Sequence, residues 1–194
     1  MRRTILSALM FSACLAGPSG AQQTPPAPLP ARQAPLAPLK NPPGDIPDDQ
    51  AFIDYRSPLG FMLKTPEGWS RREQPNGVTF SDRYGSIGIE ISPATAPPTI
   101  ATATQVQAAA LASLPTAVVV SKVSSVALPS GPAILIAYAS NSAPNAVTGK
   151  AIRLENEQYL FWRDGKVATL TLSAPFGADN ADQWQLIAKS FKWI

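Results

Sequence analysis

Histidine is absent from this sequence of 194 residues, and cysteine occurs once, at Cys14. Without histidine, the common catalytic triads and the histidine-ligated metals and haems are excluded. Cys14 lies in an N-terminal apolar run, so the rest of the chain offers neither an internal disulfide nor a thiolate site. Charged residues make up only 15% of the chain, against 45% hydrophobic residues. This composition predicts a packed core under a lightly charged surface.

Motifs of the common enzyme classes are also missing. No serine has lysine three residues after it, and there is no nucleophile elbow, phosphate loop or dinucleotide fingerprint. Glu155 and Glu157 form the closest carboxylate pair, and their spacing places both on one face of a strand, usually a solvated one. We therefore predict that the protein is not an enzyme and has no metal or cofactor. A carboxylate-type hydrolase is one alternative.

The N-terminus has the pattern of a secretory signal. A basic start at Met1–Arg3 precedes the apolar run Thr4–Ala16, which is short for a membrane span. Small residues at Ser19–Ala21 predict cleavage between Ala21 and Gln22. Residues 1–21 are thus a predicted signal peptide, and the mature protein is predicted to be exported to the periplasm, the cell envelope or the extracellular space.

Two alternatives for this segment remain open. Small residues before Cys14 also suit a lipoprotein, in which Cys14 is acylated and retained at a membrane; an uncleaved anchor is the other alternative. Cleavage after Ala21 removes Arg2 and Arg3, which leaves 14 basic against 13 acidic groups, a charge of +1. The precursor's basic pI of 9.2 is therefore no argument for nucleic-acid binding, and no nucleic-acid partner is predicted.

Residues 22–50 are rich in proline, which lacks a backbone N–H and cannot propagate helix or sheet pairing. We predict an extended spacer that tethers the domain near a membrane or cell wall; a ligand for a proline-recognising partner is the alternative. The acidic residues at its end have a spacing that fits no calcium loop. The nine prolines are Pro25, Pro26, Pro28, Pro30, Pro35, Pro38, Pro42, Pro43 and Pro47, and the acids are Asp45, Asp48 and Asp49.

The folded domain, residues 51–194, begins with alternating side chains. Phe61, Leu63 and Thr65 are predicted to share one face of a strand, and Met62 and Lys64 the other. Residues 65–68, Thr-Pro-Glu-Gly, have the chemistry of a type I turn, with proline second and glycine fourth. Further strands are predicted at 78–81 and 86–91, joined by a turn at 82–85. Together the three strands predict an antiparallel meander, with Ile87, Ile89 and Ile91 facing the core and Gly88 and Glu90 on the other face.

The run from Phe61 to Trp69, Phe-Met-Leu-Lys-Thr-Pro-Glu-Gly-Trp, followed by Phe-Ser-Asp and Ile-x-Ile-x-Ile strands, resembles the PsbP-like (Mog, PsbP and DcrB-like) superfamily, here in an exported bacterial protein. The resemblance covers residues 51–194. It implies an α+β fold, an α/β/α sandwich in which a central, mainly antiparallel sheet carries helices on its faces. It also implies that the domain works through binding and has no common catalytic activity.

The rest of the domain predicts two helices among further strands. A capping box at Thr102 and Gln105 begins a helix that runs to Leu114, with Val106, Ala110 and Leu114 on one stripe. The final helix follows Asn180, a predicted cap with Gln183, and carries the stripe Trp184, Ile187, Ala188 and Phe191, with Trp184 in the core. Strands are predicted at 118–128, 133–140, 149–156, 158–163 and 167–174, with turns at 129–132 and at Asp164-Gly165 and with Leu170 and Leu172 inward.

These features predict an accessory domain that binds a protein or an envelope component, whose identity the sequence does not give. The alternative binding function is a carrier of a small apolar ligand or lipid in a pocket between sheet and helices. Arg71 and Arg72 beside Trp69 are the candidate partner-binding residues, because paired guanidinium groups suit a phosphate or an acidic surface. Solvated arginines after a turn are the other interpretation of the same residues.

Overall fold

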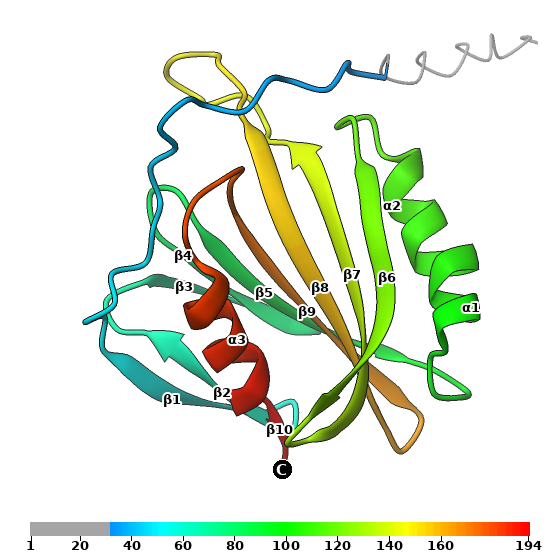
Figure 1. The fold of residues 1–194 in the computed structure, drawn as a ribbon. Helices are drawn as coiled ribbons and strands as arrows, with labels where there is room; N and C mark the ends of the chain where they lie inside the picture. The colour runs from blue at the N-terminus through cyan, green and yellow to red at the C-terminus, as the bar shows by residue number, and fades with distance from the viewer. Residues whose placement is uncertain (1–31) are drawn as a thin grey trace, which may run out of the picture.

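The computed structural model describes residues 32–194, which form an α+β domain with two antiparallel sheets (Figure 1). The predicted signal peptide, its cleavage site and Cys14 lie outside the described residues. No helix within residues 32–194 has the length and apolar character needed to cross a bilayer. The elements are β1 (Phe52–Ser57), β2 (Phe61–Pro66), β3 (Ser70–Gln74), β4 (Gly77–Ser81), β5 (Ser86–Pro93), α1 (Ile100–Ala103), the π-helical turn η1 (Thr104–Ala108), α2 (Ala109–Ser113), β6 (Val119–Leu128), β7 (Gly131–Asn141), β8 (Arg153–Arg163), β9 (Lys166–Pro175), α3 (Ala181–Ser190) and β10 (Lys192–Trp193).

The larger sheet has seven strands in the order β3-β4-β5-β9-β8-β7-β6, all paired antiparallel. The predicted hairpin at Asp164-Gly165 joins β8 to β9, and both residues have positive φ angles, 48° and 78°, as a type I′ turn requires. The predicted turn at 82–85 is also confirmed, since the Asp82 carboxylate accepts hydrogen bonds from the backbone N–H groups of Tyr84 and Gly85.

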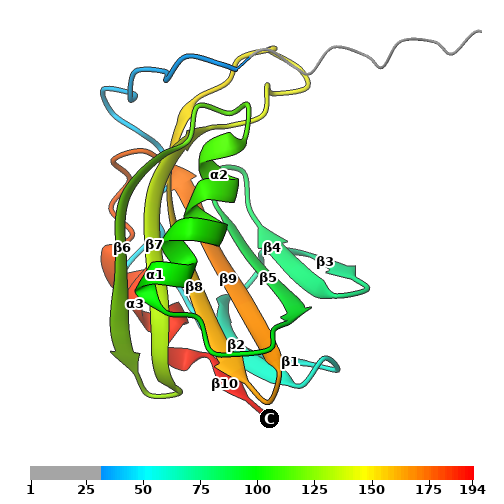
Figure 2. The same cartoon turned by 90° about the vertical axis from the view of Figure 1, so that its right-hand side faces the viewer.

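Helices cover the two faces of this sheet (Figures 1 and 2). On one face, α1, η1 and α2 place Ala103 and Ala108 against Ile136 and Leu160. On the other face lie α3 and the small sheet β1-β2-β10. Side chains alternate along β8, so Leu160 faces α1 while its neighbours Tyr159 and Phe161 face the opposite core. This arrangement confirms the predicted sheet with helices on its faces.

The main core lies between α3, the small sheet and the large sheet. As predicted, Phe61, Leu63 and Thr65 are buried on β2, and Leu170 and Leu172 are buried on β9. The helix stripe Trp184, Ile187, Ala188 and Phe191 is buried as well, and Ile91 is half-buried beside Ile87 and Ile89.

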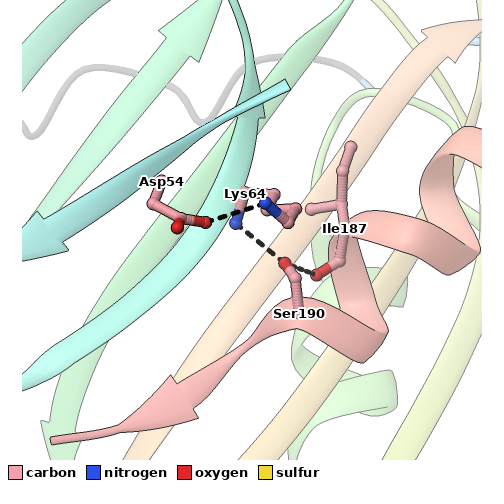
Figure 3. Close-up of polar contacts among 4 residues, drawn as sticks. All are labelled: Asp54, Lys64, Ile187 and Ser190. Carbon is pink, nitrogen blue, oxygen red and sulfur yellow. Dashed lines mark hydrogen bonds and ion pairs between the residues drawn. The ribbon is translucent and has the colours of Figure 1, made fainter. Parts of the chain in front are cut away.

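The last turn of α3 is fixed to β2 by polar contacts (Figure 3). The backbone N–H of Lys64 donates to Ser190 Oγ at 2.8 Å, and that hydroxyl donates to the Ile187 carbonyl at 2.6 Å. The Lys64 ammonium pairs with Asp54 of β1 at 3.0 Å. Beyond α3 the chain continues into β10, which pairs with β2 and which the sequence did not predict.

The predicted meander is wrong in its first strand. β2 does not pair with the strand at 77–81; it pairs with β1 and β10 in the small sheet. Gly68, at a φ of 85°, turns the chain into the larger sheet, where β3 pairs with β4. All five residues of β3 are exposed and polar, so β3 has no apolar alternation by which it could be recognised.

The two strands predicted at 149–156 and 158–163 are one continuous strand, β8. In the structure Asn156 is buried and donates to Ser140 Oγ at 3.0 Å, and Glu157 accepts from Tyr159 at 2.6 Å. Because these polar groups find partners, the strand continues without interruption.

The first helical segment begins earlier than predicted, and the predicted stripe faces solvent. Thr99 is the N-cap residue, and Thr102, which was predicted to be the N-cap, occupies the third helical position of the capping box. The π-helical turn Thr104–Ala108 adds a residue, which rotates the later side chains about the helix axis. Val106 is consequently 60% exposed, whereas Ala103, at 0%, faces the sheet.

A leucine at Ala103 tests this helix phase. Ala103→Leu is expected to lower the free energy of unfolding by about 1–3 kcal/mol, because an added side chain must displace the packed sheet face. Ala101 is exposed, so Ala101→Leu should change the stability by about 0.5 kcal/mol or less. Urea denaturation of both variants measures the difference. Equal losses would contradict the assignment of Ala103 to the buried side.

Residues 32–50, here called the strap, have no helix or strand, as the prolines predict, but they are not a free spacer. The strap lies against the domain, where the backbone N–H of Leu36 donates to Asn141 and that of Ile46 donates to Asn180. Ile46 is itself buried in the main core. Proline fixes an extended backbone, and this extended backbone is held by side-chain amides of the domain instead of by a neighbouring strand.

Candidate functional site

A pocket of about 540 Å³, here called the α3-side pocket, lies on the α3 side of the large sheet. In Figure 1, α3 does not extend over the strands β8, β7 and β6. Ala137 and Ala139 of β7 line the pocket and, being small, leave space above the sheet. The remaining apolar walls come from the edge strand β6, the strap, the loop after β9 and α3, as Val119, Pro38, Phe176 and Trp184.

Two carboxylates, Glu155 and Glu157 of β8, line this pocket. Their predicted position on one face of a strand is confirmed, but that face is half-buried and not freely solvated. In the strand register, Glu155 is opposite Ala139 and Ala174, and Glu157 is opposite Ala137 and Leu172. Neither carboxylate has an ion-pair partner among residues 32–194. Both acids therefore lie between apolar neighbours in the floor of the pocket.

The surroundings differ between the two acids. Glu157 accepts a hydrogen bond of 2.6 Å from the Tyr159 hydroxyl, which fixes its orientation. Burial raises the pKa of Glu155 and is the largest influence on it; a hydrogen bond from the Gly177 backbone lowers this pKa, and the neighbouring charge of Glu157, the smallest influence, raises it. Burial and the contact with Glu157 also raise the pKa of Tyr159, so its hydroxyl remains a hydrogen-bond donor at neutral pH.

The raised pKa of Glu155 predicts a dependence of stability on pH. The folded chain holds this proton more tightly than the unfolded chain does, so the contribution of Glu155 to stability falls as pH rises from the ordinary value of 4.5 through the raised folded value. Glu155→Gln should therefore gain stability relative to the wild type between about pH 4 and about pH 7. Urea denaturation at both pH values measures this. A relative loss of stability for the variant at the higher pH would contradict the direction.

Arg153 lies two residues before Glu155 on the same face of β8 and also lines the pocket. Its side chain is only 5% exposed, and burial lowers the pKa of its guanidinium, which nevertheless stays charged at neutral pH. Its Nη1 donates to the Ala117 carbonyl at 2.8 Å and to Asn141 Oδ1 at 3.1 Å. Asn141 in turn holds the strap, so Arg153 joins the pocket to the strap.

No family model matches this sequence, and no curated protein matches it. Among solved structures, the cyanobacterial PsbP (CyanoP) of Synechocystis superposes with a TM-score of 0.56 at 15% identity, over 78% of this chain and 98% of that chain. The Ran-binding protein Mog1p of Saccharomyces cerevisiae superposes with a TM-score of 0.50 at 13% identity, over 75% of this chain and 96% of that chain. This chain has the PsbP-like fold. The resemblance inferred from residues 61–91 is therefore confirmed for the fold.

In this PsbP-like domain, the residues predicted to bind a partner lie away from the pocket. Trp69 is half-buried against the core, and Arg72 is exposed on β3. The Arg71 guanidinium lies 5.6 Å from the centre of the Tyr55 ring, and its Nε is 3.4 Å from Glu73. Arg71 and Arg72 are adjacent in a strand and point to opposite sides, so a single flat partner would engage only one of them. Their role in partner binding stays a prediction.

The sequence did not single out Arg153, the charged residue most deeply buried in the PsbP-like domain between residues 32 and 194. A signal was present, since Arg153, Glu155 and Glu157 alternate on one face of a strand whose next residues on that face are Tyr159 and Phe161. The prediction of two separate strands at 149–156 and 158–163 concealed this row. Within residues 32–194 no group of three or more acidic residues is placed to hold a metal ion.

A second pocket, of about 340 Å³, lies near the turn between β6 and β7. It is lined by Pro97, Pro98, Ser130 and Trp162, together with residues of β7 and β8. The indole N–H of Trp162 and the hydroxyl of Ser130 have no hydrogen-bond partner among the described residues, but both atoms are enclosed. This pocket has no charged lining residue. It therefore lacks charged groups that could orient a ligand, which the α3-side pocket has.

Proposed function

We propose that this chain is an exported, non-catalytic accessory domain that binds its partner or ligand in the α3-side pocket. The observation that carries the proposal is the pocket itself, where apolar walls surround charged side chains that no other described residue neutralises. Proteins rarely retain such charges on a half-buried face without a use, because desolvation without pairing costs free energy. One of the proteins that share the fold is named for binding a partner protein, Ran, which supports a binding role.

Export is part of the proposal and is supported by the N-terminal sequence. Mass measurement of the mature chain from its native host tests it directly. Cleavage between Ala21 and Gln22 gives a chain that begins at Gln22, whereas a lipoprotein begins at an acylated Cys14. A mature chain that keeps Met1–Arg3 and stays in the cytosol would contradict export.

Site-directed photocrosslinking in the native host tests the binding site. A photoreactive amino acid at Val119, on the exposed rim of the pocket, is expected to crosslink a partner that mass spectrometry then identifies. Ile53, on the outer side of β1, is equally exposed and is the control position. Crosslinking at Ile53 and not at Val119 would place the partner surface elsewhere on the domain.

The two alternatives from the sequence fit the pocket unequally. A carrier of a purely apolar ligand would bury Glu155, Glu157 and Arg153 against a molecule that cannot bind them, which is unfavourable. A carboxylate-type hydrolase is favoured by one observation, the raised pKa of Glu155 beside Glu157, because a general acid must hold its proton near neutral pH. Assays with chromogenic glycosides and esters test it. Turnover that is lost in both Glu155→Gln and Glu157→Gln would establish catalysis and contradict the proposed function.

A further inference from the structure

Three charges follow one another along one face of β8 inside the pocket: the guanidinium of Arg153 and the carboxylates of Glu155 and Glu157. Residues two apart in a strand have Cα atoms separated by about 7 Å. Arg153 is nevertheless within ion-pair distance of neither acid, since the ion pairs between residues 32 and 194 involve other side chains. The row therefore presents one positive and two negative groups to whatever occupies the pocket.

Arg153 is more than nine-tenths buried, yet only one of its nitrogens is used. Nη1 makes both hydrogen bonds, to Ala117 and to Asn141, and both acceptors are uncharged. The donors on Nε and Nη2 have no partner among the described residues, neither atom is fully enclosed, and Arg153 lines the pocket. A buried guanidinium with free donors is a receptor for a carboxylate or phosphate group, which it binds through two N–H groups at once.

Glu155 is the complementary feature. No side chain among residues 32–194 donates a hydrogen bond to it, and its one hydrogen-bond donor is the Gly177 backbone. Of its two charged neighbours along the face, Arg153 forms no ion pair with it and Glu157 has the same sign. An ammonium group between the two acids would offset this repulsion and bind the carboxylate oxygens that Gly177 and Tyr159 do not already occupy. Glu157 is already oriented by Tyr159, so one side of such a site is preformed.

The uncharged walls define the rest of the ligand. Val119, Phe176 and Trp184 provide an apolar surface beside the charged row, and about 540 Å³ exceeds what a single small ion needs. We propose that the α3-side pocket binds a zwitterion that carries an apolar body, with its acidic group on Arg153 and its ammonium group on Glu155 and Glu157. The inference rests on the proposed binding function and adds the chemical class of the ligand.

A charge-matched series of ligands tests the class on the full mature chain. L-phenylalanine carries both charges, its amide only the ammonium, N-acetylphenylalanine only the carboxylate, and N-acetylphenylalaninamide neither. Calorimetric titration is expected to show that L-phenylalanine binds at least 10-fold more tightly than either singly charged compound. Equal affinities across the series, or a preference for the uncharged compound, would overturn the proposal.

Variants assign each charge to its residue. Glu155→Gln removes a charge without breaking a hydrogen bond between side chains. It should lower the affinity for L-phenylalanine and for its amide about 10-fold, and leave the affinity for N-acetylphenylalanine unchanged. Arg153→Lys keeps a positive charge but loses the planar guanidinium that can donate two parallel hydrogen bonds. It should lower the affinity for the two ligands that carry a carboxylate, L-phenylalanine and N-acetylphenylalanine. Glu67→Gln is the matched control, on an exposed turn residue outside the pocket. Parallel losses for all four ligands in either pocket variant would contradict the assignment.

The same pair of charges occurs in a free amino acid and in a zwitterionic lipid headgroup. Short-chain phosphatidylethanolamine, below its micellar concentration, provides the second arm of the titration. Tighter binding of the lipid would identify the headgroup as the source, and tighter binding of L-phenylalanine would identify the amino acid. If neither binds while a partner still crosslinks at Val119, the ligand class is wrong and the proposed function stands; if crosslinking also fails, the proposed function is wrong as well.

Discussion

Phe191→Ala is expected to lower the free energy of unfolding by about 3–5 kcal/mol, one of the largest losses that a single substitution in this domain can cause. Phe191 is 0% exposed and lies where three elements meet. Its ring is stacked 4.1 Å from Phe161 of β8 and 6.0 Å from Phe61 of β2, centre to centre. Removing the ring would leave a cavity that α3, the small sheet and the large sheet all border, so none of them can close it alone.

The measurement is urea denaturation of Phe191→Ala beside Leu186→Ala. Leu186 is on the outer side of α3 and is partly exposed, so its truncation should cost about 1 kcal/mol or less. Leu186 lies in α3 and Phe191 directly follows it. Comparing the two variants therefore separates the loss of core packing from an effect on the helix itself. If Phe191→Ala cost no more than Leu186→Ala, the aromatic stack would not be what holds α3 to the sheets.

Asn180→Ala is expected to lower the free energy of unfolding by about 1–3 kcal/mol and to release the strap. Asn180 is 2% exposed; its Oδ1 accepts from the Ile46 backbone N–H at 2.6 Å, and its Nδ2 donates to the Gly44 carbonyl at 3.0 Å. Alanine would leave both backbone groups without a partner in a buried position, and the strap could satisfy them only by moving into water.

Limited proteolysis with trypsin detects the release of the strap. Cleavage after Lys40, in the exposed part of the strap, should be about 10-fold faster in Asn180→Ala than in the wild type, because trypsin needs a locally detached chain. Asn76→Ala is the control: Asn76 is exposed and donates to Glu90, so its loss should affect neither stability nor cleavage greatly. An unchanged rate of cleavage in Asn180→Ala would show that other contacts hold the strap.

Asn180 also shows where sequence reasoning identified the right residue for the wrong reason. Its position before α3 predicted a helix cap, and the backbone does begin the helix there. Its side chain, however, makes no capping hydrogen bond and holds the strap, 134 residues earlier in the sequence. A short polar side chain suits both tasks, and only the presence of Ile46 beside it decides between them.

The α3-side pocket was predicted only in part. Glu155 and Glu157 were identified as a pair on one face because strand alternation is a local property. Their half-burial, and the inclusion of Arg153 in the same row, depend on how far α3 extends over the sheet and on where the strap lies. Those are contacts between segments distant in sequence, so the predicted solvated face became the floor of a pocket.

What the sequence determined by itself was the local structure: the alternation in β5 and β9, the hairpin at Asp164-Gly165, the buried stripe of α3 and, through its motif at residues 61–91, the fold. The local features follow from backbone sterics and side-chain periodicity, which act over a few residues, whereas the fold was implied by the resemblance of the motif to the PsbP-like superfamily. The tertiary structure alone decided which sheet β2 joins, which side of α1 is buried, where the strap lies and which charges share a pocket. Each of these depends on the partner that a half-polar segment meets, and that partner is set by the packing of the whole chain.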